Sequence, residues 1–209
     1  MSYQFHYDWF TPYLSEVEPE LRSLAGKPGL QILEIGSFEG RSAVWFLQEL
    51  LTAPGSGLTC IDPWQITPEM VDFEPEIMIA WAEARFDSNT ALALQQSPAQ
   101  LQKIKAPSEA VLPLLPAGYF DLILVDGSHR APFVLSDLVF AWRLLKPQGL
   151  LWCDDYGYDR FVEPHWNPAL AIDSFLACYQ GFYAELHRGY QVLLRKTGEG
   201  GKPGLRREG

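Results

Sequence analysis

Aspartate side chains follow two of the strongest apolar runs in the sequence. Asp126 comes directly after the run 120–125, and Asp154 and Asp155 come directly after the run 150–153. Short apolar runs that end in turns are typical of buried parallel strands, and such sheets bind ligands beyond the carboxyl ends of their strands. We therefore expect these three carboxylates to converge at one edge of a sheet.

Three converging carboxylates repel one another, which is costly unless something neutralises them. A hard divalent cation, Mg²⁺ or Mn²⁺, would relieve that repulsion, so Asp126, Asp154 and Asp155 are predicted metal ligands. The alternative is that one or two of these acids cap helices or face solvent. His129, three residues after Asp126, is a candidate general base because its pKa is easily tuned. It equally suits a polar position at a helix start.

A glycine turn follows the first apolar run, Leu30–Ile35, with glycine at positions 36 and 40. Glycine lets the backbone turn tightly and approach a ligand, and the N–H groups that open the next helix suit a carboxylate or phosphate. Asp62 follows the next apolar run and is placed to accept hydrogen bonds from ribose hydroxyls. Each feature alone also fits an ordinary strand–turn–helix; together they predict a nucleoside-type ligand. The glycine spacing differs from that of dinucleotide binders and P-loops.

Strand-like and helix-like stretches alternate along the chain, which predicts an α/β protein whose mostly parallel sheet is covered on both faces. A closing hairpin makes the last strand antiparallel. The predicted strands are 30–35, 58–61, 103–106, 120–125, 150–153, 182–187 and 190–195, and the predicted helices are 41–51, 76–102, 132–146 and 169–179. The residues 146–149 are expected to form a turn.

Bulk composition narrows the class of protein. The chain has 209 residues, enough for one domain with a sizeable core. Its net charge of −10 argues against nucleic acid and anionic membranes as main partners. Cys60 and Cys153 lie in apolar runs and are predicted to be buried free thiols, and neither a signal peptide nor a membrane span is recognised. These features predict a cytoplasmic protein.

Aromatic residues crowd the first part of the chain, between Tyr3 and Tyr13. So many rings are expected to pack on the body of the protein, and a lid or a homodimer contact is the alternative. The stretch after residue 196 is rich in glycine and charge and is expected to fray.

The motifs taken together resemble class I S-adenosylmethionine-dependent methyltransferases, in particular the small-molecule O-methyltransferase branch that includes macrolide-sugar and catechol enzymes. The resemblance covers residues 30–195 and rests on five stretches in order. They are Glu34-Ile35-Gly36-Ser37-Phe38-Glu39-Gly40-Arg41-Ser42, Ile61-Asp62-Pro63-Trp64, Ala106-Pro107-Ser108-Glu109, Val125-Asp126-Gly127-Ser128-His129 and Asp154-Asp155-Tyr156.

The resemblance implies a Rossmann-like, doubly wound sheet of seven strands. It divides the chain into an aromatic N-terminal segment (1–28), a methyltransferase domain (29–196) and a C-terminal tail (197–209). It implies that the Gly36 turn holds the methionine part of the cofactor, that Asp62 binds the ribose, and that Trp64 and Ser108 flank the adenine. The implied cofactor residues are Glu34, Gly36, Ser37, Gly40, Ser42, Asp62, Trp64, Ser108 and Asp126.

The function expected from this resemblance is metal-assisted O-methylation of a small hydroxylated molecule, of sugar or polyketide type, with Asp126 and His129 as catalytic residues. The acidic pair Asp154-Asp155 replaces the Asp-Asn or Glu-Asp of related branches, and His129 replaces the lysine of the catechol type. A hydroxylase-like relative and a non-catalytic cofactor-binding protein remain alternatives. A nicotinamide dehydrogenase is the least favoured, because the glycine spacing argues against it.

Overall fold

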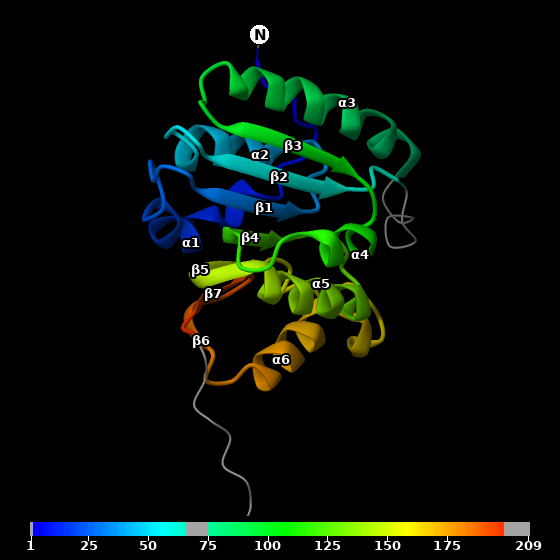
Figure 1. Cartoon of the computed structure of the whole chain (residues 1–209). Helices are drawn as coiled ribbons and strands as arrows, with labels where there is room; N and C mark the ends of the chain where they lie inside the picture. Colours follow the sequence, from blue (N-terminus) through cyan, green and yellow to red (C-terminus); the bar gives the residue numbers. More distant parts are fainter. Residues whose placement is uncertain (1, 66–74, 199–209) are drawn as a thin grey trace, which may run out of the picture.

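A seven-stranded sheet runs through the molecule, with its strands in the order β3-β2-β1-β4-β5-β7-β6 (Figure 1). The computed structural model describes residues 2–65 and 75–198, with the backbone alone for 75–80. Strand β7 is antiparallel to β5 and β6, and the remaining pairs are parallel. The strands are β1 (Gln31–Ile35), β2 (Gly57–Asp62), β3 (Gln100–Lys105), β4 (Phe120–Val125), β5 (Leu145–Cys153), β6 (Tyr183–Arg188) and β7 (Val192–Lys196).

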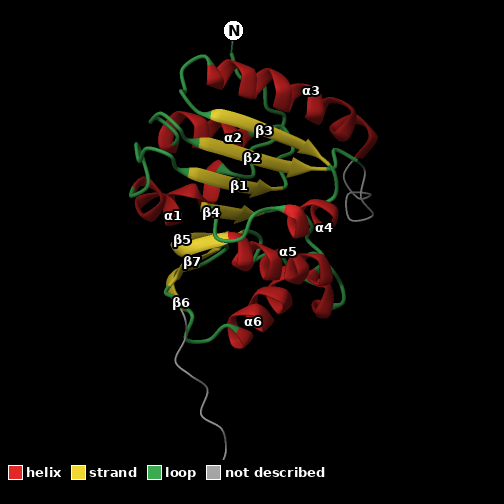
Figure 2. Ribbon diagram, viewed as in Figure 1, coloured by secondary structure: helices red, strands yellow, loops and turns green. Residues whose placement is uncertain are grey.

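Helices cover both faces of this sheet (Figure 2). One face carries α1 (Thr11–Arg22), α2 (Arg41–Trp45), the π-helical turn η1 (Phe46–Leu50) and α3 (Pro75–Leu94). The other carries α4 (Ser108–Val111), the 3-10 turn η3 (Leu112–Leu114), α5 (Ala131–Leu144) and α6 (Pro168–Cys178), and the short turn η4 (Pro164–Trp166) precedes α6. The predicted fold class is confirmed: a doubly wound, mostly parallel sheet whose last strand is antiparallel.

Strand β1 shows how the sequence builds two cores. Ile32 belongs to the buried cluster on the α1–α3 face, and Leu33 to the cluster on the α4–α6 face, because successive strand side chains point to opposite faces. The strand pairs in parallel with β2 on one edge and β4 on the other. The arrowheads of β1, β2 and β3 point to one edge of the sheet in Figure 1, and the predicted site residues follow the strands at that edge.

Two predicted boundaries were wrong. The helix predicted to reach residue 102 ends at Leu94, and β3 begins at Gln100. Pro98 cannot continue a helix, and the mixed polar sequence of this edge strand hid its extended conformation. The turn predicted over 146–149 lies within β5, where the pairing with β4 shifts between Phe120 and Leu122.

Helix α1 was not predicted; its buried residues Leu14, Val17 and Leu21 pack on the sheet.

Other predictions can be compared with the described residues. Cys60 and Cys153 are buried free thiols, as predicted, and Cys178 is exposed. In the described parts of the chain, no helix is both long and apolar enough to cross a membrane. The expected fraying of the tail concerns mostly residues 199–209, which lie outside the described residues.

Candidate active site

Glu34, a fully buried residue of β1, supports the loop between β1 and α2. Its carboxylate accepts hydrogen bonds from the hydroxyls of Ser37, at 2.6 Å, and of Ser42. The Cys60 thiol also donates to it, at 3.2 Å. Burial raises the pKa of Glu34, and the hydroxyl donors oppose that rise. Three of the predicted cofactor residues therefore meet beneath this loop.

Asp62, at the end of β2, stabilises the same loop through hydrogen bonds to its backbone. One of its oxygens accepts hydrogen bonds from the backbone N–H groups of Ser37 and Phe38, each at 2.9 Å. The other oxygen accepts from the N–H of Trp64 at 2.6 Å. A carboxylate offers about four acceptor positions, so the backbone uses most of them. Asp62 thus shapes the loop, a role that the sequence analysis missed, and retains limited capacity for ribose hydroxyls.

The indole ring of Trp64 also stabilises this loop. Its Nε1 donates to the Phe38 carbonyl at 2.8 Å, and its ring lies against Phe86 and under the Lys103 ammonium. Trp64 is buried, and Phe38 is held at a φ of 44°, in the left-handed region. The structure therefore gives Trp64 a role in positioning the loop, and contact of its ring with adenine stays a prediction.

Gly36 brings this loop against the loop that follows β4. Gly36 has a φ of 86°, and a Cβ atom built on it would lie 1.9 Å from the backbone oxygen of Asp126. The Gly36 N–H donates to Ile61 O at 2.8 Å, and the Asp126 N–H donates to Ile35 O at 2.8 Å. The predicted cofactor loop (residues 36–40) and the loop that carries Asp126 therefore touch through backbone atoms, at a position where only glycine fits.

Asp126 and Asp154 share a partly buried acidic environment. Burial, followed by repulsion from Asp154 and Asp155, raises the pKa of Asp126 well above its usual range. Burial, followed by repulsion from Asp155, raises the pKa of Asp154 to about 7. Asp154 Oδ1 accepts hydrogen bonds from the fully buried Gln191, at 2.9 Å, and from the Asp155 N–H, at 2.7 Å. The predicted carboxylates therefore interact electrostatically, as expected of neighbouring strand ends.

His129 pairs with the third acid. Its Nε2 lies 2.9 Å from Asp155 Oδ2, and the Tyr190 hydroxyl donates to Asp155 Oδ1 at 3.1 Å. The His129 ring stacks on Tyr158, with centroids 4.6 Å apart. Among the described residues, no three histidine, cysteine, aspartate or glutamate side chains are arranged to hold a metal ion. The three expected metal ligands are thus close enough to repel one another, while the carboxylate of Asp155 contacts His129 and Tyr190.

The aromatic N-terminal segment lies beside both loops. Trp9 stacks on Phe38 of the cofactor loop, with centroids 5.3 Å apart, and Tyr7 stacks on Trp9 at 4.8 Å. Tyr13 stacks on Tyr190, the partner of Asp155, at 4.0 Å. Polar contacts hold the segment in place: the His6 N–H donates to Glu39 at 2.6 Å, and Asp8 lies 3.3 Å from Arg41. This segment therefore spans from the cofactor loop to the acidic cluster.

Ser108 begins α4 and donates a hydrogen bond from its hydroxyl to Asp137 Oδ1 of α5 at 2.7 Å. The N-cap position belongs to Pro107, so Ser108 is not a helix cap. Asp137 is only 3% exposed, and burial raises its pKa to about 7. Sequence reasoning missed Asp137, although its spacing of three residues from Val134 placed an acid on the apolar stripe of that helix.

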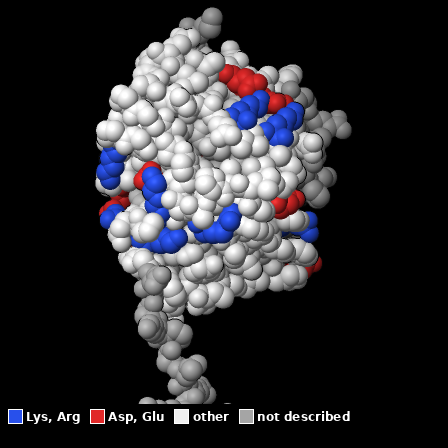
Figure 3. All heavy atoms as spheres, viewed as in Figure 1, with Lys and Arg blue, Asp and Glu red and all other residues white. Residues whose placement is uncertain are grey.

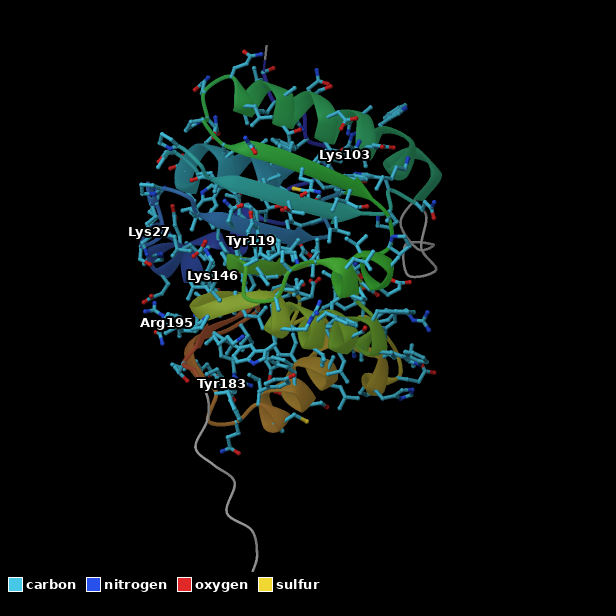
Figure 4. All side chains as sticks on the ribbon, in the orientation of Figure 1. Lys27, Lys103, Tyr119, Lys146, Tyr183 and Arg195 are labelled. Carbon is cyan, nitrogen blue, oxygen red and sulfur yellow. The ribbon has the colours of Figure 1, made fainter. Side chains whose placement is uncertain are left out.

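Charged side chains on the face shown in Figure 3 are mixed in sign, with acids next to several of the basic groups. Lys103 is bonded to Glu83 and Asp87 at 2.8 and 2.7 Å. Figure 4 places Lys146 and Arg195 together on the opposite side from the arrowheads of β2 and β3, and they contact Asp121 and Glu20 at 2.8 and 3.2 Å. Lys103, Lys146 and Arg195 are therefore each paired with an acid, and Lys146 and Arg195 lie away from the predicted site.

Residues 33–156 match a family described as a methyltransferase domain. The match begins in β1, covers the cofactor loop, Asp62, Ser108, Asp126 and His129, and ends just after the acidic pair. It spans more than half of the chain, and the chain therefore belongs to this methyltransferase family. No curated protein sequence matches the chain.

Solved structures share the fold at low sequence identity. An O-methyltransferase from Bacillus cereus in complex with SAH has a TM-score of 0.61 and 14% identity, covering 92% of this chain and 84% of its own. The O-methyltransferase NovP has a TM-score of 0.64 and 15% identity, covering 89% and 77%. A 1,6-didemethyltoxoflavin-N1-methyltransferase from Burkholderia thailandensis has a TM-score of 0.53 and 17% identity, covering 87% and 76%. The fold alone therefore does not select the acceptor atom.

Replacement of Gly36 tests the contact between the two loops. We expect Gly36→Ala to lower the free energy of unfolding by at least about 3 kcal/mol, because the new methyl group must displace the Asp126 backbone. Gly29→Ala is a matched control, since Gly29 also has a positive φ, 72°, but has open space around it; it should cost only about 1 kcal/mol. Urea unfolding measures both values, and equal losses would contradict the close contact.

Replacement of Asp137 tests its buried carboxyl. Because the pKa of Asp137 is raised in the folded state to about 7, the folded protein binds the proton more tightly, and its stability falls as the pH rises from about 4 to 7. Asp137→Asn removes this dependence. Relative to the unaltered protein, the variant should gain about 3 kcal/mol between pH 5 and pH 8. Urea unfolding at both pH values measures the gain, which Asp159→Asn, at an exposed position, should not reproduce.

Proposed function

We propose that this chain is an S-adenosylmethionine-dependent O-methyltransferase that acts on a small hydroxylated molecule of sugar or polyketide type. The observation that carries the proposal is the backbone contact between the Gly36 loop and the Asp126 loop, which sets the predicted cofactor loop beside a partly buried cluster of acids and a histidine. Membership of a methyltransferase family supports the reaction type. The complex of the Bacillus cereus enzyme with SAH supports the choice of cofactor.

The cofactor would lie along the carboxyl edge of β1, β2 and β3. In this proposal the loop from Gly36 to Gly40, supported by Glu34, Ser37 and Ser42, binds the methionine part. The remaining acceptor capacity of Asp62 receives a ribose hydroxyl, and Ser108 lies near the base. The segment before Ser108 is joined to this edge by a hydrogen bond from the Ala106 N–H to Asp62 O at 3.2 Å.

Methyl transfer from a sulfonium is an in-line displacement, so most of the catalytic work is positioning and removal of the acceptor proton. The hydroxyl oxygen forms a bond to the methyl carbon, the carbon–sulfur bond breaks, and the hydroxyl proton leaves to a base. We propose His129 as that base. Its Nε2 lies 2.9 Å from Asp155 Oδ2, and this carboxylate would orient the imidazole ring.

Divalent-cation assistance is part of the proposal on the chemistry of the donor set, although the described side chains are not arranged to hold an ion as they stand. Asp126, Asp154 and Asp155 supply only oxygen donors, as Mg²⁺ or Mn²⁺ prefers. Burial, followed by repulsion from Asp154 and Asp155, raises the pKa of Asp126. These three residues would hold the ion. A bound cation would lower the pKa of a hydroxyl that it contacts.

An aromatic face supports an acceptor that contains a ring. Trp9 is 52% exposed, Tyr7 is 40% exposed, and their rings are stacked with an interplanar angle of 12°. Phe38 continues the stack into the cofactor loop. Flat aromatic faces pack well on sugar rings and on aromatic rings. We propose that this stack forms one wall of the acceptor site, which agrees with the expected sugar or polyketide type.

The setting of the enzyme is also proposed. The buried free thiols of Cys60 and Cys153 are typical of a reducing compartment, which supports the cytoplasm. The net charge of −10 supports a small-molecule acceptor over nucleic acid or a membrane surface. A homodimer through the aromatic segment remains a proposal that light scattering of the purified protein would test.

Product mass separates a methyltransferase from a hydroxylase-like relative, since the product gains a methylene unit in one case and an oxygen atom in the other.

Asp126→Asn tests the catalytic cluster. On a panel of sugar and polyketide alcohols, we expect turnover to fall by at least about 100-fold, because the variant loses a charge next to the reacting hydroxyl. Chelation should lower turnover of the unaltered enzyme, and added Mg²⁺ should restore it. Asp121→Asn is the control, at the other end of β4, and should keep most of the turnover. Full activity under chelation would remove the cation from the proposal, and an active Asp126→Asn would remove Asp126.

Trp9→Ala tests the aromatic wall. We expect the KM for the acceptor to rise by about tenfold, while affinity for the cofactor changes little, because loss of a stacking ring removes about 1–2 kcal/mol of acceptor binding. The control is Trp81→Ala on α3, since Trp81 is 53% exposed and therefore almost equally so. Steady-state kinetics against each substrate separates the two parameters. Equal KM changes in both variants would contradict the assignment.

A further inference from the structure

Asp155 has an unusual backbone conformation in the turn that follows β5. Its φ is 59°, in the left-handed region, which is uncommon for residues other than glycine and persists where the surrounding structure holds it. The Tyr158 N–H donates to Asp155 O at 3.0 Å, and the Gly157 N–H donates to Tyr190 O at 2.9 Å. The turn that carries Asp155 is therefore attached to the segment that precedes β7.

The ring of Tyr190 has close contacts with two separate parts of the chain. A Cβ atom built on Gly157 would lie 2.6 Å from Tyr190 Cδ2, so the ring packs directly on the turn at a residue that has no side chain. Tyr13 of α1 stacks on the same ring, with centroids 4.0 Å apart and an interplanar angle of 8°. These contacts leave the ring little freedom, and its hydroxyl donates to Asp155 Oδ1 at 3.1 Å.

The two oxygens of the Asp155 carboxylate have different partners. Oδ1 accepts the hydrogen bond from Tyr190, and Oδ2 lies 2.9 Å from His129 Nε2. A carboxylate is planar and can accept at both oxygens, so a partner that fixes one oxygen also fixes the direction of the other. The Asp155 side chain is only 15% exposed, and water therefore competes little for either oxygen. Tyr190, Asp155 and His129 thus form a continuous series of contacts.

We propose that Tyr190 is a positioning residue of the methyl-transfer reaction: it fixes the carboxylate of Asp155, which in turn orients the His129 ring towards the acceptor hydroxyl. This inference rests on the proposed role of His129 as the base. Orientation matters because proton transfer requires the ring nitrogen within hydrogen-bond reach of the hydroxyl. Since Tyr13 stacks on Tyr190, helix α1 also contributes to the placement of the base.

A crystal structure of Tyr190→Phe tests the positioning directly, because this variant loses the hydroxyl and keeps the ring. We expect the Asp155 carboxylate to rotate, so that the distance from its Oδ2 to His129 Nε2 exceeds about 3.5 Å. Tyr183→Phe is the matched control, since Tyr183 is also half-buried and its hydroxyl donates to Leu176 O at 3.4 Å. The control should keep the Asp155–His129 pair, and a Tyr190→Phe structure that also keeps this pair overturns the inference.

Steady-state kinetics on the panel of sugar and polyketide alcohols measures the effect on catalysis. We expect Tyr190→Phe to lower kcat by about tenfold and to leave the KM for S-adenosylmethionine within about twofold, because the hydroxyl acts on the base and not on cofactor binding. Tyr183→Phe should keep kcat. An equal fall of kcat in both variants, or a change confined to KM, overturns the inference.

Gly157→Ala moves the Tyr190 ring without removing its hydroxyl. The new methyl group must displace the ring, so kcat should fall as in Tyr190→Phe. Gly149→Ala, within β5, is the control, because a Cβ atom there is similarly crowded, at 2.8 Å from Leu145 Cδ1; it should keep kcat. A fully active Gly157→Ala overturns the inference, and if this variant does not fold by circular dichroism, Tyr190→Phe decides.

Failure of the proposed function gives a different result. If the unaltered protein methylates no alcohol of the panel, the proposed function is overturned, and the crystal structures of Tyr190→Phe and Tyr183→Phe then decide the inference by themselves. If the unaltered protein is active and Tyr190→Phe is equally active, the inference alone is overturned.

Discussion

The site depends on a contact that leaves no room for a side chain. Gly36 and the backbone of Asp126 approach so closely that a Cβ atom at residue 36 would overlap the Asp126 carbonyl oxygen, at 1.9 Å. Strands β1 and β4 are neighbours in the sheet, and the loops that follow them can meet only if one presents bare backbone. The carboxylates of Glu34 and Asp62 then hold the β1 loop in the shape that permits this contact. Main-chain packing thus sets the position of the Gly36 loop relative to the loop that carries Asp126.

Much of this arrangement could be predicted from the sequence because it follows from strand order. Apolar runs ending in Asp62, Asp126 and Asp154 identify parallel strands, and parallel strands bring their carboxyl ends to one edge. The edge strand β3 was misplaced by three residues because its alternating polar side chains face water and lack an apolar signature. Helix α1 was missed because aromatic residues and two prolines at positions 12 and 19 obscure helical periodicity.

The partners of each side chain could not be predicted, since they depend on atoms far apart in the sequence. The position of Asp62 indicates a ligand-binding edge, but only the structure shows three backbone N–H groups on its carboxylate. The pairing of His129 with Asp155 and of Ser108 with Asp137 depends on the approach of separate elements. Residue types therefore indicate which chemistry is present, and the directions of hydrogen bonds determine which atom performs it.

The acidic cluster depends on residues of the β6–β7 hairpin, which are synthesised after the strands that carry the acids. Gln191 and Tyr190 stand immediately before β7 and contact Asp154 and Asp155 from the far end of the chain. A nascent chain that has emerged only through α6 already contains the glycine loop and all three acids, but it lacks these neutral donors. In such a chain, Asp154 and Asp155 lack the hydrogen bonds that Gln191 and Tyr190 donate to them. The complete acidic cluster therefore requires the segment between β6 and β7 in addition to the loops that follow β4 and β5.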